Sequence, residues 1–202
     1  MNELISKISN LFKKYGIKST TMDDIAKEFG ISKKTLYQHF ENRNEIIYKV
    51  AQYELKNEFD ELDRLFSLHS NAIDQLLFIS KHIASNLHSL NPSLTYDMNK
   101  YYPEIWEQLV SLRKEYILKL IKRNLKVGMK QGIYRRNLNT DIIAVFYTFL
   151  LDIKGFEMYN DALNEDFDIM FNTLFTYHIY GIANKEGIEY LEKKLKILQP
   201  II

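Results

Sequence analysis

The sequence predicts an all-α protein in which a small N-terminal helical module is followed by a larger helical bundle. Two observations carry this prediction. Apolar residues recur at intervals of three and four along most of the chain, which is the spacing of one face of an α-helix. In addition, the 202 residues include only seven glycines and three prolines. So few turn formers leave little room for the frequent tight turns of a β-sandwich or barrel.

Composition places the chain among soluble globular proteins. Hydrophobic residues make up 46% of the sequence and charged residues 26%, a balance that disordered chains lack. Cysteine is absent, which excludes disulfides, thiolate metal sites and a cysteine nucleophile. The first residues show no signal peptide, and the most apolar stretch, residues 142–151, is too short to span a bilayer. We therefore expect a soluble, cytoplasmic protein without a membrane partner.

The first helix and the start of the second are marked by local signals. An apolar stripe that begins at Leu4 and ends at Tyr15 predicts the first helix, and Gly16 follows it directly. Thr21 is expected to cap the second helix. Its hydroxyl would accept from the backbone N–H of Asp24, in a variant of the capping box with aspartate in place of glutamate.

The next signals define a pair of short helices. Gly30 ends the second helix after about two turns, and Ser32 is a suitable cap for a third helix from residue 33 to about residue 40. A fourth helix follows, capped by Asn42, with Glu45 as the reciprocal partner. Two short helices that are joined by a tight glycine turn and packed against a preceding helix describe a helix-turn-helix.

The positions left exposed on this module point to DNA. In a bound helix-turn-helix, the second helix of the pair enters the major groove through its N-terminal residues, which are Lys33, Lys34 and Thr35 here. Lysine donates to guanine O6 and N7 or to phosphate, and threonine contacts the thymine methyl group. Double-stranded DNA is therefore the predicted partner. The candidate phosphate-contacting residues are Thr20, Thr21, Tyr37, His39 and Arg43.

The same segment resembles the signature of the TetR family of transcriptional regulators. The matching runs are Thr20-Thr21-Met22-Asp23-Asp24-Ile25-Ala26 and Phe29-Gly30-Ile31-Ser32-Lys33-Lys34-Thr35-Leu36-Tyr37-Gln38-His39-Phe40. The resemblance implies an all-helical homodimer with an N-terminal DNA-binding domain and a divergent ligand-binding domain. It also implies that Thr21 and Tyr37 contact the DNA backbone, and that Lys33, Lys34 and Thr35 form the base-facing turn.

Three positions depart from the family pattern. A small residue or proline is common where Lys34 stands, lysine is common where Arg43 stands, and a small residue is common where Phe29 stands. From the resemblance and the helical pattern, we expect residues 1–46 to form a three-helix, helix-turn-helix DNA-binding domain. Residues 47–202 are expected to form a helical ligand-binding and dimerisation domain.

The remainder of the chain is predicted to form a helical bundle that dimerises. Apolar periodicity continues the fourth helix to residue 66 and predicts further helices over residues 73–90, 103–130, 141–159, 167–183 and 188–198. Two of them, 141–159 and 167–183, are apolar around most of their circumference, so both of their sides need cover. A partner subunit is the natural cover for the second side. The residues expected at the dimer interface are Ile142, Val145, Phe146, Phe149, Met170, Leu174, Phe175 and His178.

Aromatic residues gather near residues 91–93, where proline and its neighbours break the helical pattern. Aromatic rings with a few polar tips line small-molecule cavities, and they equally fill large helical cores. Both interpretations stay open at this point. The candidate binding residues for a small apolar or aromatic effector are Phe78, His82, Tyr96, Tyr102, Trp106, Tyr116 and Phe149.

Three classes of function compete for this sequence. An enzyme is disfavoured, because the five histidines are scattered and no HExxH motif, glycine-rich phosphate loop or GxSxG elbow occurs. We expect no catalytic residue, metal or cofactor. The favoured function is a ligand-responsive repressor that binds an inverted-repeat operator as a homodimer, with half-sites ~34–36 Å or a multiple apart. The alternative is a DNA-binding adaptor whose C-terminal domain binds another protein and no small ligand.

Overall fold

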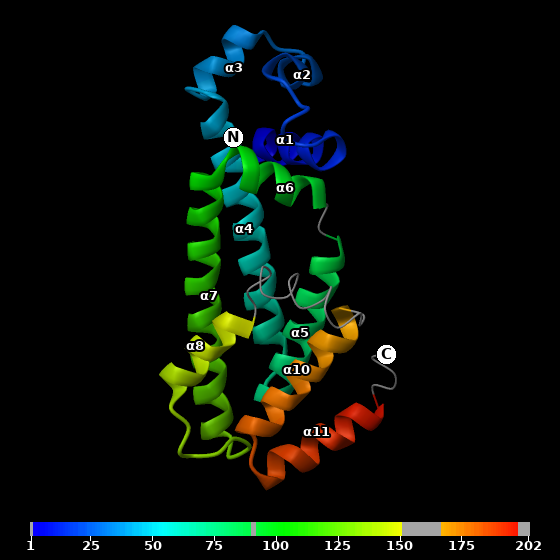
Figure 1. Ribbon diagram of the computed structural model, residues 1–202, viewed down its shortest axis with the longest axis vertical. Coiled ribbons are helices and arrows are strands. Elements are labelled where there is room, and N and C mark those ends of the chain that lie inside the picture. Colours follow the sequence, from blue (N-terminus) through cyan, green and yellow to red (C-terminus); the bar gives the residue numbers. More distant parts are fainter. Residues whose placement is uncertain (1, 90–91, 151–166, 198–202) are drawn as a thin grey trace. The chain divides into compact units, whose positions relative to one another are not determined.

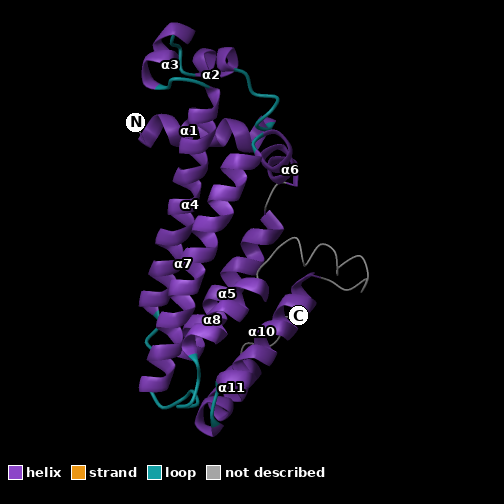
Figure 2. Ribbon diagram, turned by 60° about the vertical axis from the view of Figure 1, so that its left-hand side comes forward, coloured by secondary structure: helices purple, strands orange, loops and turns teal. Residues whose placement is uncertain are grey.

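The computed structural model describes residues 2–89, 92–150 and 167–197. Its elements are α1 (Asn2–Tyr15), α2 (Met22–Glu28), α3 (Lys33–His39), α4 (Arg43–Leu68), α5 (Ala72–Ser89), α6 (Pro92–Tyr101), α7 (Pro103–Lys130), α8 (Thr140–Leu150), α10 (Phe167–Ile182) and α11 (Lys185–Ile197) (Figure 1). All secondary-structure elements of the described ranges are helices (Figure 2). Tyr134 and Ala183 form an isolated antiparallel β-bridge. The all-α prediction is confirmed.

The chain folds into two compact units. The first unit contains Met1–Glu61 and Ser89–Arg113, and the second contains Leu62–His88 and Lys114–Ile202. Each unit has its own apolar cluster. This division does not coincide with the boundary expected after residue 46, because α6 and the beginning of α7 pack with the N-terminal helices.

The core of the first unit is built from the predicted apolar stripes. Ile8, Ile25 and Leu36 are fully buried and come from α1, α2 and α3. Tyr15, the last member of the predicted α1 stripe, is instead 55% exposed. Polar contacts add to this packing, since the Glu54 carboxylate on α4 accepts from the Ser9 hydroxyl at 2.6 Å and from the Lys13 ammonium at 2.7 Å.

The core of the second unit is formed by apolar side chains of α5, α7, α8, α10, α11 and the end of α4. The predicted bounds of α7 agree with the structure, whereas α11 begins at Lys185, three residues earlier than expected. The Asn184 side chain explains this start, because its carbonyl accepts from the N–H of Gly187 at 3.0 Å. The predicted helix over 141–159 is present up to Leu150, and its remainder falls outside the described residues.

Glycine with a positive φ follows three helices, and the sequence predicted this at Gly16 and Gly30. Gly16, Gly30 and Gly132 have φ values of +89°, +62° and +72°, a region that residues with a Cβ rarely adopt. Among the helices of the described ranges, none combines the length and the apolar character that a bilayer crossing requires.

Candidate nucleic-acid interface

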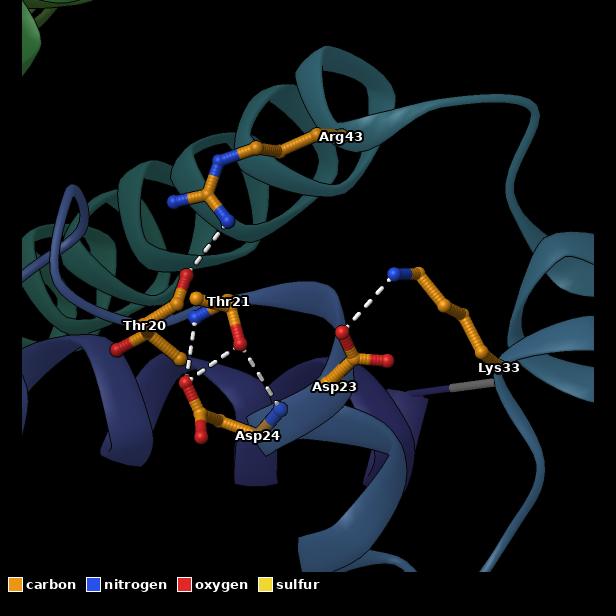
Figure 3. A network of polar contacts seen from close by, with 6 residues as sticks. All are labelled: Thr20, Thr21, Asp23, Asp24, Lys33 and Arg43. Carbon is orange, nitrogen blue, oxygen red and sulfur yellow. Dashed lines mark hydrogen bonds and ion pairs between the residues drawn. The ribbon is translucent and has the colours of Figure 1, made fainter.

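The helix α2 begins with the predicted capping box. The Thr21 hydroxyl accepts from the backbone N–H of Asp24 at 3.1 Å, and the Asp24 carboxylate accepts from the backbone N–H of Thr21 at 2.8 Å (Figure 3). The same carboxylate also accepts from the Thr21 hydroxyl at 2.6 Å. These hydrogen bonds favour the ionised carboxylate, so they lower the pKa of Asp24. The Thr21 hydroxyl therefore already donates and accepts within the protein.

The helix α3 exposes polar side chains on one face and buries Leu36 on the other. Ser32 caps it as predicted, with its hydroxyl accepting from the N–H of Thr35 at 3.0 Å. Leu36 is fully buried and Phe40, just after the helix, is 1% exposed. The exposed residues of α3 are Lys33, Lys34, Tyr37, Gln38 and His39. Sequence reasoning missed Gln38, which lies one turn beyond Lys34 and so shares a face with it.

An ion pair links the two helices of the helix-turn-helix. The Lys33 ammonium lies 3.0 Å from a carboxylate oxygen of Asp23, and their side chains are 48% and 72% exposed (Figure 3). The hydrogen bond to Asp23 raises the pKa of Lys33. Lys34 has no ion-pair partner among the residues that the structure describes. The two predicted base-facing lysines therefore differ in their ion pairing, because the ammonium of Lys33 is paired with Asp23 of the same chain.

Arg43 points into the protein rather than into solvent. One terminal nitrogen donates to the carbonyl of Thr20 at 2.5 Å (Figure 3). The other terminal nitrogen donates to the carbonyl of Ile17, and Nε donates to the Tyr102 hydroxyl at 3.1 Å. This corrects the expectation that Arg43 contacts a DNA phosphate. The sequence could not reveal this arrangement, since two of the three acceptors are backbone carbonyls.

Thr20 is a second correction among the predicted phosphate contacts. Its side chain is 2% exposed, and its hydroxyl donates to the carbonyl of Gly16 at 2.7 Å. A buried and bonded hydroxyl does not reach a phosphate. The role that the structure gives Thr20 is to close the turn after α1 and to accept, through its carbonyl, from Arg43.

The cap of α4 differs in one detail from the predicted box. The Asn42 side chain accepts from the N–H of Glu45 at 2.9 Å, as expected. The Glu45 carboxylate, however, accepts from the N–H of Glu41 at 2.6 Å instead of from that of Asn42. The Glu45 side chain thus reaches one residue further back than the predicted capping box, and both of the predicted partners still act in starting the helix.

The helix α6 fixes the segment that precedes α2. The Asp97 carboxylate accepts from the backbone N–H of Lys18 at 2.9 Å, and the Lys18 ammonium lies 3.9 Å from the ring centroid of Tyr101. These contacts place α6 beside the turn between α1 and α2 (Figure 1). Asp97 and Tyr101 are positioning residues that sequence reasoning missed, because they lie about 80 residues beyond the turn that they hold.

The predicted effector residues are divided between the two units. Tyr96, Tyr102 and Trp106 belong to the first unit, and Phe78, His82 and Tyr116 belong to the second. Within its unit, Tyr102 bonds to Arg43, Tyr96 is 56% exposed, and Phe78 stacks on His69 with ring centroids 3.9 Å apart. The side chain of Phe149 lies outside the described residues. Neither unit by itself gathers the set into one site.

Of the predicted dimer residues, those on α8 are exposed. Ile142, Val145 and Phe146 are 67%, 41% and 56% exposed. On α10 the prediction is corrected, because Phe175 and His178 are buried and both rings contact Tyr147 of α8.

The exposed apolar side chains of α10 lie on its opposite face. They are Ile169, Tyr177 and Tyr180. Leu174 is half-buried, and the side chains of Met170 and Phe149 are not among those described. Within the described ranges, no group of three histidine, aspartate or glutamate side chains is arranged to hold a metal ion.

Comparison with known proteins agrees with this geometry. Residues 4–49 match the family model described as bacterial regulatory proteins, tetR family. The transcriptional repressor KstR2 of Mycolicibacterium smegmatis is 24% identical over 154 residues, which cover 75% of this chain and 74% of that protein.

Two solved structures show the same fold. A transcriptional regulator from Cytophaga hutchinsonii superposes with a TM-score of 0.75 at 20% identity, over 90% of this chain and 97% of the other. A transcriptional regulator from Saccharomonospora viridis in complex with choline gives a TM-score of 0.59 at 18% identity, over 90% and 96%. The helix-turn-helix, the match to the family model and the curated relative together show that the chain belongs to the TetR family of transcription regulators.

Proposed function

We propose that this protein represses transcription in the cytoplasm by binding an inverted-repeat operator as a homodimer, with α3 in the major groove. The observation that carries the proposal is the exposed face of α3, where Lys33, Lys34, Tyr37 and Gln38 project from a helix anchored by buried Leu36. Two lysines and an amide are the donors that read guanine and adenine edges in the major groove.

The roles of the individual side chains follow from their surroundings. Lys34 carries an exposed charge at the start of α3, and Gln38, exposed one turn later, would bond an adenine. Tyr37 and His39, both exposed, act on phosphate oxygens. Thr21 contributes to a phosphate contact only if its hydroxyl releases the Asp24 carboxylate, since it is the donor in that bond.

Dimerisation is proposed through the exposed apolar face of α8 and α10. Ile142, Val145 and Phe146 on α8, with Tyr177 and Tyr180 on α10, leave large apolar side chains in water in a single protomer. Contiguous exposed apolar surface marks an interface. Two helices from each subunit would then form the interface, and a twofold axis requires an operator with inverted half-sites.

Release by a small molecule is the final part of the proposal. The repressor KstR2 is a relative of this chain, and the Saccharomonospora viridis regulator with the same fold was solved in complex with choline. We therefore propose that an effector binds the second unit and favours a dimer whose recognition helices no longer match the half-sites. The coupling is reciprocal, so DNA would weaken effector binding by the same factor.

The test is selection of double-stranded DNA from a random library. Wild-type protein is compared with a Lys33→Ala, Tyr37→Phe variant and with Lys193→Ala, a control that removes an exposed lysine from α11. We expect an inverted repeat from the wild type and the control, and none from the double variant. If the wild type enriches no sequence at low salt, where phosphate contacts are strongest, DNA binding is wrong. An enriched site without symmetry would contradict the dimer.

A further inference from the structure

Two neighbouring side chains in the core of the second unit each carry a buried polar atom that has no hydrogen-bond partner in the described part of the chain. The atoms are the hydroxyl of Tyr147 on α8 and Nε2 of His178 on α10. The two side chains are 1% and 8% exposed, and their ring centroids lie 3.8 Å apart at an interplanar angle of 69°. Buried polar atoms almost always have a partner, so this pair requires an explanation.

The same core satisfies its other buried tyrosine. The Tyr134 hydroxyl donates to the side-chain carbonyl of Asn124 at 3.1 Å, and the amide nitrogen of Asn124 donates to Gln75 at 3.0 Å. The network continues through the Gln75 side-chain amide, which donates to the backbone carbonyls of Phe66 on α4 and of His69 just after it. The fold is thus able to supply partners for a buried phenol, and it supplies none to Tyr147 among the described residues.

The other buried atoms without a bond are of a different kind. Oδ1 of Asp74 belongs to a carboxylate whose second oxygen accepts from the Tyr190 hydroxyl at 2.6 Å. Nε of Arg113 belongs to a guanidinium that donates to Glu58 at 2.7 Å. Each of these groups has a partner through another of its atoms. Tyr147 and His178 are therefore distinguished as two neighbouring side chains without such a bond in the described ranges.

The pair is suited to an uncharged oxygen. Burial lowers the pKa of His178 to about 3 and holds that of Tyr147 well above its usual value, so both rings are neutral at neutral pH. A neutral imidazole and a phenol both offer an N–H or O–H donor. Phe175 lies beside Tyr147 with ring centroids 5.8 Å apart, and Ile179 and Ile182 are buried in the same cluster. A charged ligand group would be desolvated there against two neutral partners.

We infer that Tyr147 and His178 form the polar end of an effector site for an uncharged, largely apolar molecule that carries a carbonyl oxygen. Both side chains donate to that oxygen, while the apolar body packs against Phe175 and its neighbours. The inference rests on the proposed function, since it identifies the effector class and places it between α8 and α10. Those two helices also carry the proposed dimer face, which gives the ligand a direct route to the subunit arrangement.

The first arm of the test compares pairs of probes that differ in the carbonyl. Acetophenone is matched with ethylbenzene and 2-octanone with octane, and octanoate provides the charged control. We expect each ketone to raise the Tm of the wild type more than its hydrocarbon, with no gain from octanoate. Tyr147→Phe should bind the ketones roughly tenfold more weakly, as expected for one lost hydrogen bond. Tyr134→Phe should retain the preference for ketones.

The second arm needs no ligand. Tyr147→Phe removes a hydroxyl that lacks a partner, so the midpoint of urea unfolding should stay the same or rise, whereas Tyr134→Phe should lower it. Equal destabilisation by the two variants would overturn the inference, and so would equal Tm shifts by ketone and hydrocarbon in the wild type. DNA selection distinguishes failure of this inference from failure of the proposed function. If the wild type selects an inverted repeat but binds ketone and hydrocarbon equally well, the effector site is wrong and the proposed function stands.

Discussion

The ammonium of Lys33 lies 3.0 Å from the carboxylate of Asp23, and this ion pair joins α3 to α2 across the turn of the helix-turn-helix (Figure 3). Both side chains are largely exposed, and exposed pairs of this kind are weak and screened by salt. Under the proposed function, the Asp23 carboxylate and the DNA compete for the same lysine, so DNA binding would displace Asp23.

Asp23→Asn should strengthen DNA binding. The substitution frees Lys33 and removes a negative charge from the proposed DNA-binding face, so we expect the Kd for the selected operator to fall about two- to fivefold. Fluorescence anisotropy at two salt concentrations measures it, and the gain should shrink at the higher one. Glu28→Gln, which removes the same charge from an exposed position of α2, is the control. An equal gain in the control would assign the effect to net charge alone.

Arg43→Lys should destabilise the first unit without removing a phosphate contact. Lysine cannot satisfy the Thr20 and Ile17 carbonyls and the Tyr102 hydroxyl together, so the free energy of unfolding should drop by about 1–3 kcal/mol. Tyr102→Phe removes one of these bonds and should cost less. The slope of log K against log salt should stay unchanged. Arg43→Gln, which removes the charge, should leave the slope unchanged as well, and a reduction by about 0.9 in that variant would show a phosphate contact instead.

Thr21→Val should weaken the start of α2. The variant keeps the shape of the side chain but loses the hydroxyl that accepts from the Asp24 N–H, and such caps contribute about 1 kcal/mol. Thr21→Ser retains the hydroxyl and should stay close to the wild type. Urea unfolding of the three proteins at one concentration measures the difference. A valine variant as stable as the serine variant would show that this cap contributes nothing.

Acid should destabilise the second unit through His178. Burial lowers the pKa of this histidine from 6.5 to about 3, so between these values the unfolded chain binds the extra proton and folding stability falls as the pH falls. The loss approaches about 1.4 kcal/mol per pH unit below pH 6.5. His178→Leu should show a correspondingly shallower dependence in urea unfolding between pH 4.5 and 7.5. Parallel curves for the two proteins would contradict a buried neutral imidazole.

Phe146→Arg should break the proposed dimer. Phe146 is 56% exposed on α8, and a charge placed there would be buried without a partner in an interface of α8 and α10. We expect sedimentation velocity to show a monomer with unchanged helical circular dichroism. Leu68→Arg, at a residue that is 61% exposed at the end of α4, should leave the dimer intact. If both variants sediment as the wild type does, the interface lies elsewhere.

The local start and stop signals of the helices were predictable because each depends on residues within a few positions. The hydroxyl of Thr21 and the N–H of Asp24 are three residues apart, as are Ser32 and Thr35, and both caps are present as expected. The buried stripe of α1 and the glycine turn at Gly30 were visible for the same reason. These signals were enough to identify a helix-turn-helix and the polar face of α3.

The sequence by itself therefore determined most of the helices, the caps of α2 and α3 and the family, but it did not predict α6. The tertiary structure decided which side chains face inward. From the sequence, Arg43 was predicted to contact phosphate, but in the structure it donates to the backbone carbonyls of Ile17 and Thr20. Every residue has a backbone carbonyl, so the residue types could not indicate these acceptors. Similarly, α10 is apolar on several sides, so periodicity could not tell that His178 packs on Tyr147 while Tyr177 faces solvent. The physical reason is that burial of a mainly apolar helix is settled by its neighbours in space, which the order of residues along the chain does not specify.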